Sequence, residues 1–311
     1  MIRNPLPLFL PATALLALLG SISAAPDSAK DVEEDPAFVF GAIADCQYCD
    51  ADSKNRRYNL SPEKLRKCIA DFNQQDLTHI VHLGDFIDRD WESFDVVLPI
   101  VGEAKAPVRF VLGNHDFSVA DEFKSRVPER LGLSSRYYDF VIGKWRFLVL
   151  DSNDVSLYAY PEGSKKAKES EGIYEALGGD LPKYNGAVGK EQLAWIEAQL
   201  LEAEASGETV VLHAHHPVYP FSRGHNLWND KELVALLEKH SCVAAYINGH
   251  NHNGAYGVKE GIHYLTLKGM VDTEETSYCI ARVFSDRIEI RGTGRQEDFD
   301  LVISPRPSQP Q

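Results

Sequence analysis

Five short groups of oxygen and nitrogen donors occur along the chain, and each directly follows an apolar run rich in β-branched and aromatic residues. The groups are Asp45-Cys46-Gln47, Gly84-Asp85, Gly113-Asn114-His115-Asp116, His213-Ala214-His215-His216-Pro217 and Gly249-His250-Asn251-His252. Carboxylates, amides and imidazoles together bind ions such as manganese, iron and zinc. Two such ions roughly 3.5–4 Å apart activate water for in-line displacement at phosphorus. The donor types therefore indicate a two-metal site that acts on a phosphate compound.

The apolar runs before these groups predict the strands that position them. The five runs span residues 37–44, 79–83, 108–112, 209–212 and 243–247, and other strands are predicted over 146–150, 263–267, 277–284 and 288–290. Apolar residues at helical spacing predict helices over 62–73, 189–205 and 230–239, the first with Ser61 as its N-cap. Strands that alternate with helices favour an α/β fold, in which functional residues lie beyond the carboxyl ends of the strands. We therefore expect the five groups to converge on one crevice.

The order of the donor groups is more specific than any one of them. The patterns DxQ, GDxxDR, GNHD, HxP and GHxH, in this order, resemble the calcineurin-like metallophosphoesterase superfamily, although Gln47 stands where the usual first motif has histidine. Within that superfamily, Gln47-Tyr48, Arg56-Arg57-Tyr58 and Tyr184-Asn185-Gly186 look like the manganese-dependent ADP-ribose/CDP-alcohol diphosphatases. The resemblance covers about residues 37–296.

This resemblance implies a fold and a set of roles. The fold would be α/β, with two stacked β-sheets flanked by helices in a four-layer αββα sandwich. The cofactor would be two divalent metal ions, manganese first, with iron or zinc as alternatives. The first metal would be held by Asp45, Gln47, Asp85 and His252, and the second by Asp85, Asn114, His215 and His250. His115 would lie near the scissile phosphate, where it would stabilise the phosphate charge or protonate the leaving group. Asp116 would orient His115 through a hydrogen bond.

Other side chains near the motifs are candidates for holding a substrate. Arg56, Arg57 and Arg223 are candidates for neutralising a second phosphate, because the guanidinium fork matches phosphate oxygens. Tyr48, Phe221 and Trp228 are candidates for stacking on a nucleobase, although aromatic side chains more often belong to the core. His213 and His216 flank His215, and we expect them to support the site without binding metal.

The leading interpretation is an enzyme that cleaves the phosphoanhydride of a nucleoside diphosphate compound, such as ADP-ribose or a CDP-alcohol. A metal-bound hydroxide would attack phosphorus. The alternatives are a broader phosphomonoesterase or phosphodiesterase, and a non-catalytic nucleotide-binding protein on the same scaffold. The expected partner is a small nucleotide or phosphate ester. A nucleic acid polymer is not expected, because 46 acidic against 32 basic residues give a net charge of −14. The oligomeric state is left open.

The two ends of the chain differ in composition from the middle. Arg3, the apolar run 6–20 and the small residues 21–25 predict a signal peptide over 1–25 and a secreted or periplasmic protein. Residues 26–35 read as a linker, 36–303 as the metallophosphoesterase domain and 304–311 as a tail. Within the domain, the polar stretch 152–188 predicts an insertion or lid. After signal cleavage no apolar run long enough to span a membrane remains, so no membrane association is expected.

The amide at position 47 leads to a prediction about metal preference. A neutral amide oxygen is a harder and weaker donor than an imidazole nitrogen, so Gln47 should favour Mn²⁺ over Zn²⁺ or Fe at the first metal. Replacing Gln47 with His should shift that preference towards Zn²⁺. Phosphatase activity of both proteins, reconstituted with each metal in turn, measures the shift. An unchanged order of metals would refute this account.

Overall fold

The computed structural model describes residues 1–2, 34–51, 53 and 55–304, and its main compact unit begins at Pro36. Most of the predicted signal peptide and linker, and nearly all of the tail 304–311, lie outside the described residues, so these assignments stay predictions. Within the described part of the chain, no helix is both long enough and apolar enough to cross a membrane.

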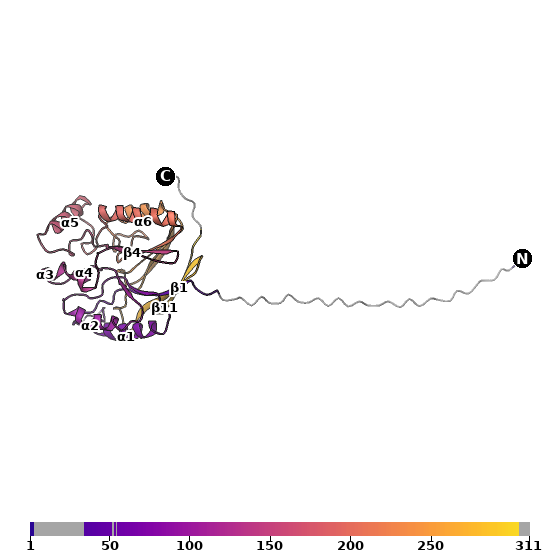
Figure 1. Cartoon of the computed structure of the whole chain (residues 1–311), viewed down its shortest axis with the longest axis horizontal. Helices are drawn as coiled ribbons and strands as arrows, with labels where there is room; N and C mark the ends of the chain where they lie inside the picture. Colours follow the sequence, from indigo (N-terminus) through magenta and orange to yellow (C-terminus); the bar gives the residue numbers. More distant parts are fainter. Residues whose placement is uncertain (3–33, 52, 54, 305–311) are drawn as a thin grey trace. The chain divides into compact units, whose positions relative to one another are not determined.

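Two six-stranded sheets form the centre of this unit (Figure 1). In the first, in the order β12-β11-β10-β1-β2-β3, β1 runs parallel to β2 and antiparallel to β10. Its strands are β1 (Phe38–Ile43), β2 (His79–His82), β3 (Val108–Phe110), β10 (Ser277–Val283), β11 (Arg287–Gly294) and β12 (Phe299–Val302). The second sheet has the order β4-β5-β6-β7-β9-β8, with parallel central strands and antiparallel edges. Its strands are β4 (Tyr138–Ile142), β5 (Trp145–Val149), β6 (Thr209–His213), β7 (Val243–Asn248), β8 (Ala255–Lys259) and β9 (Ile262–Thr266).

Helices cover the outer face of each sheet. Figure 1 shows α1 and α2 on one side of the sheets and α6 on the other. The α-helices are α1 (Ser61–Phe72), α2 (Ser93–Val101), α3 (Asp121–Lys124), α4 (Val127–Arg130), α5 (Lys165–Ala176), α6 (Lys190–Ser206) and α7 (Asp230–Glu238). Two short 3₁₀ turns, η1 (Tyr58–Leu60) and η2 (His115–Phe117), complete the elements of the described residues. This arrangement is the predicted four-layer αββα sandwich.

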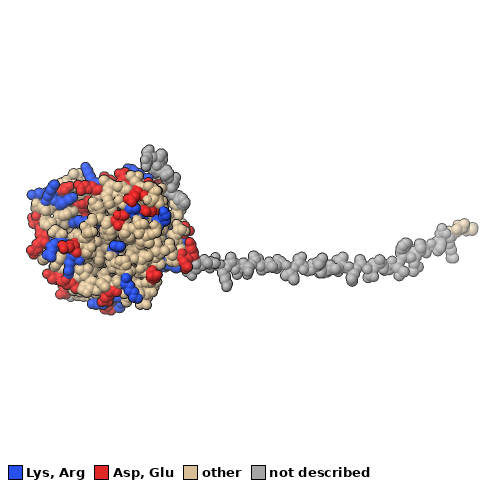
Figure 2. Space-filling view, in the orientation of Figure 1, with Lys and Arg blue, Asp and Glu red and all other residues tan. Residues whose placement is uncertain are grey.

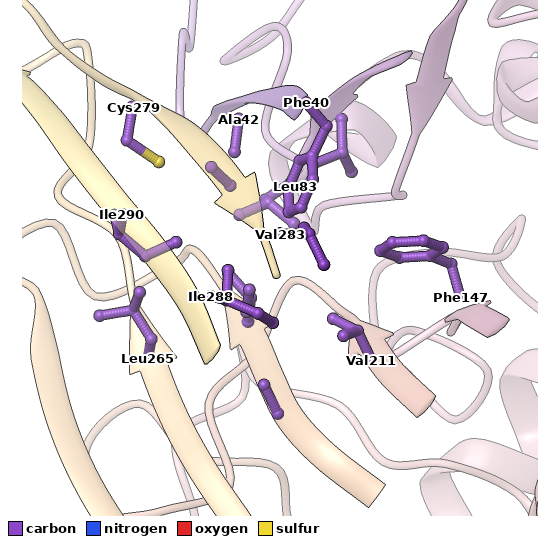
Figure 3. Packing of buried hydrophobic residues seen from close by; sticks show 14 of the residues in the cluster. Phe40, Ala42, Leu83, Phe147, Val211, Leu265, Cys279, Val283, Ile288 and Ile290 are labelled. Atoms are coloured by element: carbon purple, nitrogen blue, oxygen red, sulfur yellow. The ribbon is translucent and has the colours of Figure 1, made fainter. Parts of the chain in front are cut away.

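Successive side chains of a strand point to opposite faces of its sheet, and this alternation explains the layers. Ile80 of β2 packs outwards with Leu65 of α1, whereas its neighbour Val81 packs inwards between the sheets. In the second sheet, Leu212 packs outwards against α6 and α7, and Val211 packs inwards. Figure 3 shows this inner layer, in which Phe40 and Ile288 of one sheet meet Phe147, Val211 and Leu265 of the other. The two sheets are therefore held together by a continuous apolar layer.

The strands and helices predicted from sequence are present, with local differences. Ser61 is the first residue of α1 and does not cap it, because its hydroxyl donates to the Cys46 carbonyl at 2.6 Å. The sequence patterns did not predict α2, β4, α5, β8 or β12. In β4 and β8 the burial pattern is mostly intermediate or exposed, so neither strand has the continuous apolar run by which the inner strands were found.

Charged side chains of both signs are interspersed over the face shown in Figure 2. Although the net charge is −14, basic side chains are mixed with acidic ones on this face.

One buried imidazole belongs to the layer between the sheets. The His79 ring stacks on Phe40 with 4.8 Å between centroids and lies 5.1 Å from the Phe147 ring. Burial lowers the pKa of His79 to about 3. A histidine in an unfolded chain has a pKa of about 6.5. The unfolded state therefore binds a proton as the pH falls through that value, while the folded state stays neutral at this ring.

His79 should accordingly reduce stability in mild acid. Relative to His79→Phe, the wild-type protein should lose about 1–2 kcal/mol of unfolding free energy between pH 7.5 and pH 5. Urea unfolding of both proteins at the two pH values, in the presence of a chelator, measures this difference. A gap between the two proteins that is the same at both pH values would contradict the account.

Candidate dinuclear metal centre

The five donor groups lie at the carboxyl ends of strands from both sheets. Those at Asp45, Asp85 and Asn114 follow β1, β2 and β3 of the first sheet, and those at His215 and His250 follow β6 and β7 of the second. The predicted crevice is thus formed jointly by the two sheets.

One set of donor atoms surrounds His215. Its Nε2 atom lies 3.1 Å from Nδ1 of His250, 3.1 Å from Oδ1 of Asn114 and 3.3 Å from Oδ1 of Asp85. All four side chains are buried. These are the four residues expected to hold the second metal, and their donor atoms converge as such a role requires.

The second expected set contacts the other oxygen of the same carboxylate through Gln47. Oδ2 of Asp85 accepts a 2.7 Å hydrogen bond from Nε2 of Gln47, and Nε2 of His252 lies 3.6 Å from Oδ1 of Asp45. Oε1 of Gln47 is buried and has no hydrogen-bond partner among the described residues. An orphaned buried oxygen is costly unless a ligand satisfies it. The Asp85 carboxylate therefore faces both sets, which is the position of a bridging ligand.

Each imidazole of these sets is fixed through its other nitrogen. Nδ1 of His215 lies 2.8 Å from the Leu83 carbonyl oxygen. Nε2 of His250 lies 2.9 Å from Oδ1 of Asn185, and Nδ1 of His252 lies 2.9 Å from Oδ1 of Asp272. Metal-binding histidines are held in this way in proteins, because the second hydrogen bond sets the tautomer and the ring orientation. Carboxylate, amide and imidazole donors in this arrangement fit two divalent ions.

The backbone is strained where these residues lie. Asp45, Gln47, Asp85 and His250 have φ values of 54°, 45°, 54° and 70°. Non-glycine residues with positive φ are uncommon and persist only where the surrounding structure enforces them. A Cβ at Gly113 would overlap the backbone nitrogen of Asp85, so only glycine permits this approach of the two loops.

The electrostatics of the site show a strong negative field. Burial opposes protonation of His215, but the negative charge of Asp85 outweighs the effect of burial and raises the pKa of His215 to about 9. Burial likewise opposes protonation of His252, yet Asp45 and Asp272 raise its pKa to about 10. The field that would keep these imidazoles protonated is the field that attracts divalent cations.

The structure corrects the role expected of Asp116. Its carboxylate accepts hydrogen bonds from the backbone N–H groups of Asp85, Phe86, Ile87 and Gly113, at 2.8–3.2 Å. It therefore fixes the loop that carries Asp85 and is not the hydrogen-bond partner of His115. That partner is Asp88, whose Oδ1 lies 2.9 Å from Nδ1 of His115.

A cavity of about 470 Å³ opens over the donor sets. Its lining comprises Gln47, Arg56, Asp85, Asn114, His115, Ser118, Tyr158, Tyr184, His225, His250 and His252. Among the substrate candidates, Arg56 lines this cavity, with Nη1 3.2 Å from Oδ1 of Asp88 and 3.5 Å from Nε2 of His115. The polar stretch 152–188 contributes Tyr158 and Tyr184, and within it α5 packs against the domain.

The other substrate candidates lie outside the cavity lining. Trp228 is buried, contacts Tyr174 and donates to the Pro182 carbonyl at 3.0 Å, so it is a packing residue. Arg223 is on the surface and pairs with Asp180 at 2.7 Å. Tyr48 packs against the layer under α1 and α2, and Arg57 donates to the Ser53 carbonyl at 3.5 Å. Proximity to a motif in sequence did not distinguish these residues from Arg56.

Sequence reasoning also missed residues that the structure brings to the site. Asp88 lies within the GDxxDR pattern, and its position three residues after Asp85 was the available signal. Asn185 and Asp272 belong to remote loops. Cys46 and Cys49 are free buried thiols, and burial raises their pKa to about 12 and about 11, which disfavours redox chemistry.

Comparisons with known proteins agree with this geometry. A family model described as calcineurin-like phosphoesterase matches residues 38–254. A Danio rerio protein named manganese-dependent ADP-ribose/CDP-alcohol diphosphatase is 28% identical over 321 residues, which cover 87% of this chain and 100% of that protein. The Arabidopsis thaliana protein of the same name is 28% identical over 305 residues, which cover 86% of this chain and 97% of that protein.

Solved structures show the same relationship. A dimetal phosphatase from Danio rerio superposes with a TM-score of 0.79 at 26% identity, over 87% of this chain and 100% of that chain. A purple acid phosphatase from yellow lupin seeds has a TM-score of 0.53 at 13% identity, over 87% of this chain and 55% of that chain. The second likeness is one of fold alone.

Two neighbouring buried imidazoles provide a test of the donor assignment. The rings of His216 and His250 lie 4.3 Å apart. The nitrogens of His216 face Oγ of Ser152 at 2.8 Å and the Tyr184 carbonyl at 3.4 Å, neither of which belongs to a donor set, whereas Nδ1 of His250 faces Nε2 of His215. His250→Ala should therefore lose one of two bound Mn²⁺ ions, whereas His216→Ala should keep both. Metal content after gel filtration measures the stoichiometry, and thermal unfolding confirms that each variant is folded. Equal metal loss in the two variants would contradict the assignment.

Proposed function

Because the chain belongs to the calcineurin-like phosphoesterase family and is a metal-dependent hydrolase, we propose that it cleaves the phosphoanhydride bond of nucleoside diphosphate compounds such as ADP-ribose and CDP-alcohols. The observation that carries the proposal is the Asp85 carboxylate, which faces two donor sets beneath a cavity that also holds His115 and Arg56. The names of the Danio rerio and Arabidopsis thaliana relatives support the class of substrate.

The metal ions of the proposal are two Mn²⁺, with iron or zinc as alternatives. Asp45, Gln47, Asp85 and His252 would hold the first ion, and Asp85, Asn114, His215 and His250 the second. When bound, such ions supply Lewis-acid polarisation of a phosphoryl oxygen and an activated water nucleophile. The manganese dependence in the names of the relatives supports this choice.

His115 is the residue proposed to act on the leaving group. Its Nδ1 atom faces the Asp88 carboxylate at 2.9 Å, so that nitrogen carries a proton and the ring orientation is fixed. Nε2 remains to hold a proton beside the leaving oxygen and to transfer it as the bond to phosphorus breaks. Asp88 is a positioning residue in this step, because it acts through His115.

Arg56 is the residue proposed to distinguish a diphosphate from a monophosphate. Its guanidinium lies beside His115, on the cavity wall, and its pairing with Asp88 leaves further N–H groups for a second phosphate. A guanidinium contact to phosphate is a charge-assisted hydrogen bond, which contributes about 1.5–3 kcal/mol. A phosphomonoester offers no second phosphate to receive it.

A substrate panel tests this proposal. The Mn²⁺-loaded protein should turn over ADP-ribose and a CDP-alcohol with kcat/KM roughly 10- to 100-fold above that for p-nitrophenyl phosphate and bis(p-nitrophenyl) phosphate. Arg56→Ala should remove most of that preference. Arg223→Ala is the matched control, because it removes an equally large cation whose partner is Asp180 on the surface. Aryl phosphates that outperform both diphosphates would favour the broader phosphoesterase.

A further inference from the structure

The cavity wall has two chemically different parts. The donor residues, His115 and Arg56 form the reacting part, where charge and proton transfer are concentrated. The remaining lining residues are Ser118, Tyr158, Tyr184 and His225, which carry no carboxylate and no fixed cation. Two of these four are tyrosines from the 152–188 stretch. A wall of this composition suits an uncharged planar group better than another phosphate.

Tyr158 is held by its backbone while its ring stays exposed. The hydroxyl of Ser156 accepts hydrogen bonds from the backbone N–H groups of Tyr158 and Ala159, at 3.1 and 3.2 Å. Ser156 and Ala159 are buried, with exposed fractions of 2% and 1%, whereas that of Tyr158 is 43%. A short turn with buried anchors on either side therefore presents one aromatic ring to the cavity.

The next tyrosine along the chain stiffens the same turn. The Tyr160 hydroxyl donates to the Asp154 carbonyl at 2.9 Å. The Arg136 guanidinium lies over the Tyr160 ring, 4.9 Å from its centroid, and Nε of Arg136 pairs with Asp151 at 2.6 Å. The position of Tyr158 is thus set before any ligand arrives, which lowers the entropic cost of using its ring for binding.

The two cavity tyrosines differ in what they already contact. The Tyr184 hydroxyl donates to the Gly224 carbonyl at 3.0 Å, and its ring lies 5.8 Å from that of His250. Within the described part of the chain, the Tyr158 ring has no aromatic or cationic neighbour, and its hydroxyl has no hydrogen-bond partner. Tyr184 therefore packs against a residue of the metal site, whereas the ring face of Tyr158 is available to contact a ligand.

We propose that Tyr158 is a specificity-determining residue that stacks on the nucleobase of the substrate. This inference rests on the proposed function, since it assigns a place to the base of the same nucleoside diphosphate compound. Stacking discriminates weakly between bases, because every base has a π-face. The site should accordingly accept adenine and cytosine compounds with similar affinity, and should bind a base-free sugar phosphate much more weakly.

Equilibrium binding of a fluorescent nucleotide tests the stacking contact directly. The probe is 1,N⁶-ethenoadenosine 5′-monophosphate, added to the Mn²⁺-loaded protein, with ribose 5-phosphate as the base-free competitor. Tyr158→Ala should raise the dissociation constant of the probe roughly 5- to 100-fold and abolish quenching of its fluorescence, whereas Tyr158→Phe should retain both. The affinity of ribose 5-phosphate should be the same in all three proteins.

Phe221→Ala is the matched control. Phe221 has an exposed fraction of 44%, close to that of Tyr158, but it lies outside the lining of the catalytic cavity. Its removal should leave probe binding unchanged. Equal weakening by Phe221→Ala and Tyr158→Ala, or a loss of ribose 5-phosphate affinity equal to that of the probe, would overturn the inference.

The two proposals fail in different ways. If the wild-type protein hydrolyses no nucleoside diphosphate compound yet binds the probe through Tyr158, the proposed reaction is wrong and the stacking contact stands. If ADP-ribose is hydrolysed and Tyr158→Ala changes neither its KM nor probe binding, the reaction stands and the stacking contact is wrong.

Discussion

The position of one buried carboxylate, that of Asp85, constrains the arrangement of the whole site. Its Oδ1 atom faces His215 of the second sheet, and its Oδ2 atom faces Gln47 of the first. Because both oxygens are engaged at once, the ends of the two sheets must meet within a few ångströms of it. The apolar layer between the sheets holds them at that separation, so packing far from the site determines the distances within it.

The loop that carries Asp85 shows how this position is enforced. Asp116 accepts hydrogen bonds from four backbone N–H groups of the loops at Asp85 and Gly113, and Gly113 allows the two loops to touch. Burial, with Asp85 close by, raises the pKa of Asp116 to about 7. Several carboxylates in one dry pocket repel each other, and divalent cations relieve that repulsion. The fold therefore concentrates negative charge at a site where divalent cations would stabilise it.

Sequence patterns predicted the parts of this site that depend on local order. A donor that directly follows an apolar strand must lie at the end of a sheet, and this placed Asp45, Asp85, Asn114, His215 and His250 together. Contacts between loops have no such local signature. Asp88 and Asp116 are both acidic residues within motifs, and only the fold shows that Asp88 reaches His115 while Asp116 turns to the backbone. Trp228 and Tyr158 likewise differ in burial, which composition does not encode.

The location of bound manganese would show directly whether Asp85 bridges two ions. Anomalous diffraction at the manganese edge, from crystals of the Mn²⁺-loaded protein, would place each ion relative to the side chains. We expect two peaks on either side of the Asp85 carboxylate, one beside Gln47 and His252 and one beside His215 and His250. A single peak, or two peaks that do not share Asp85, would contradict a bridging role for Asp85.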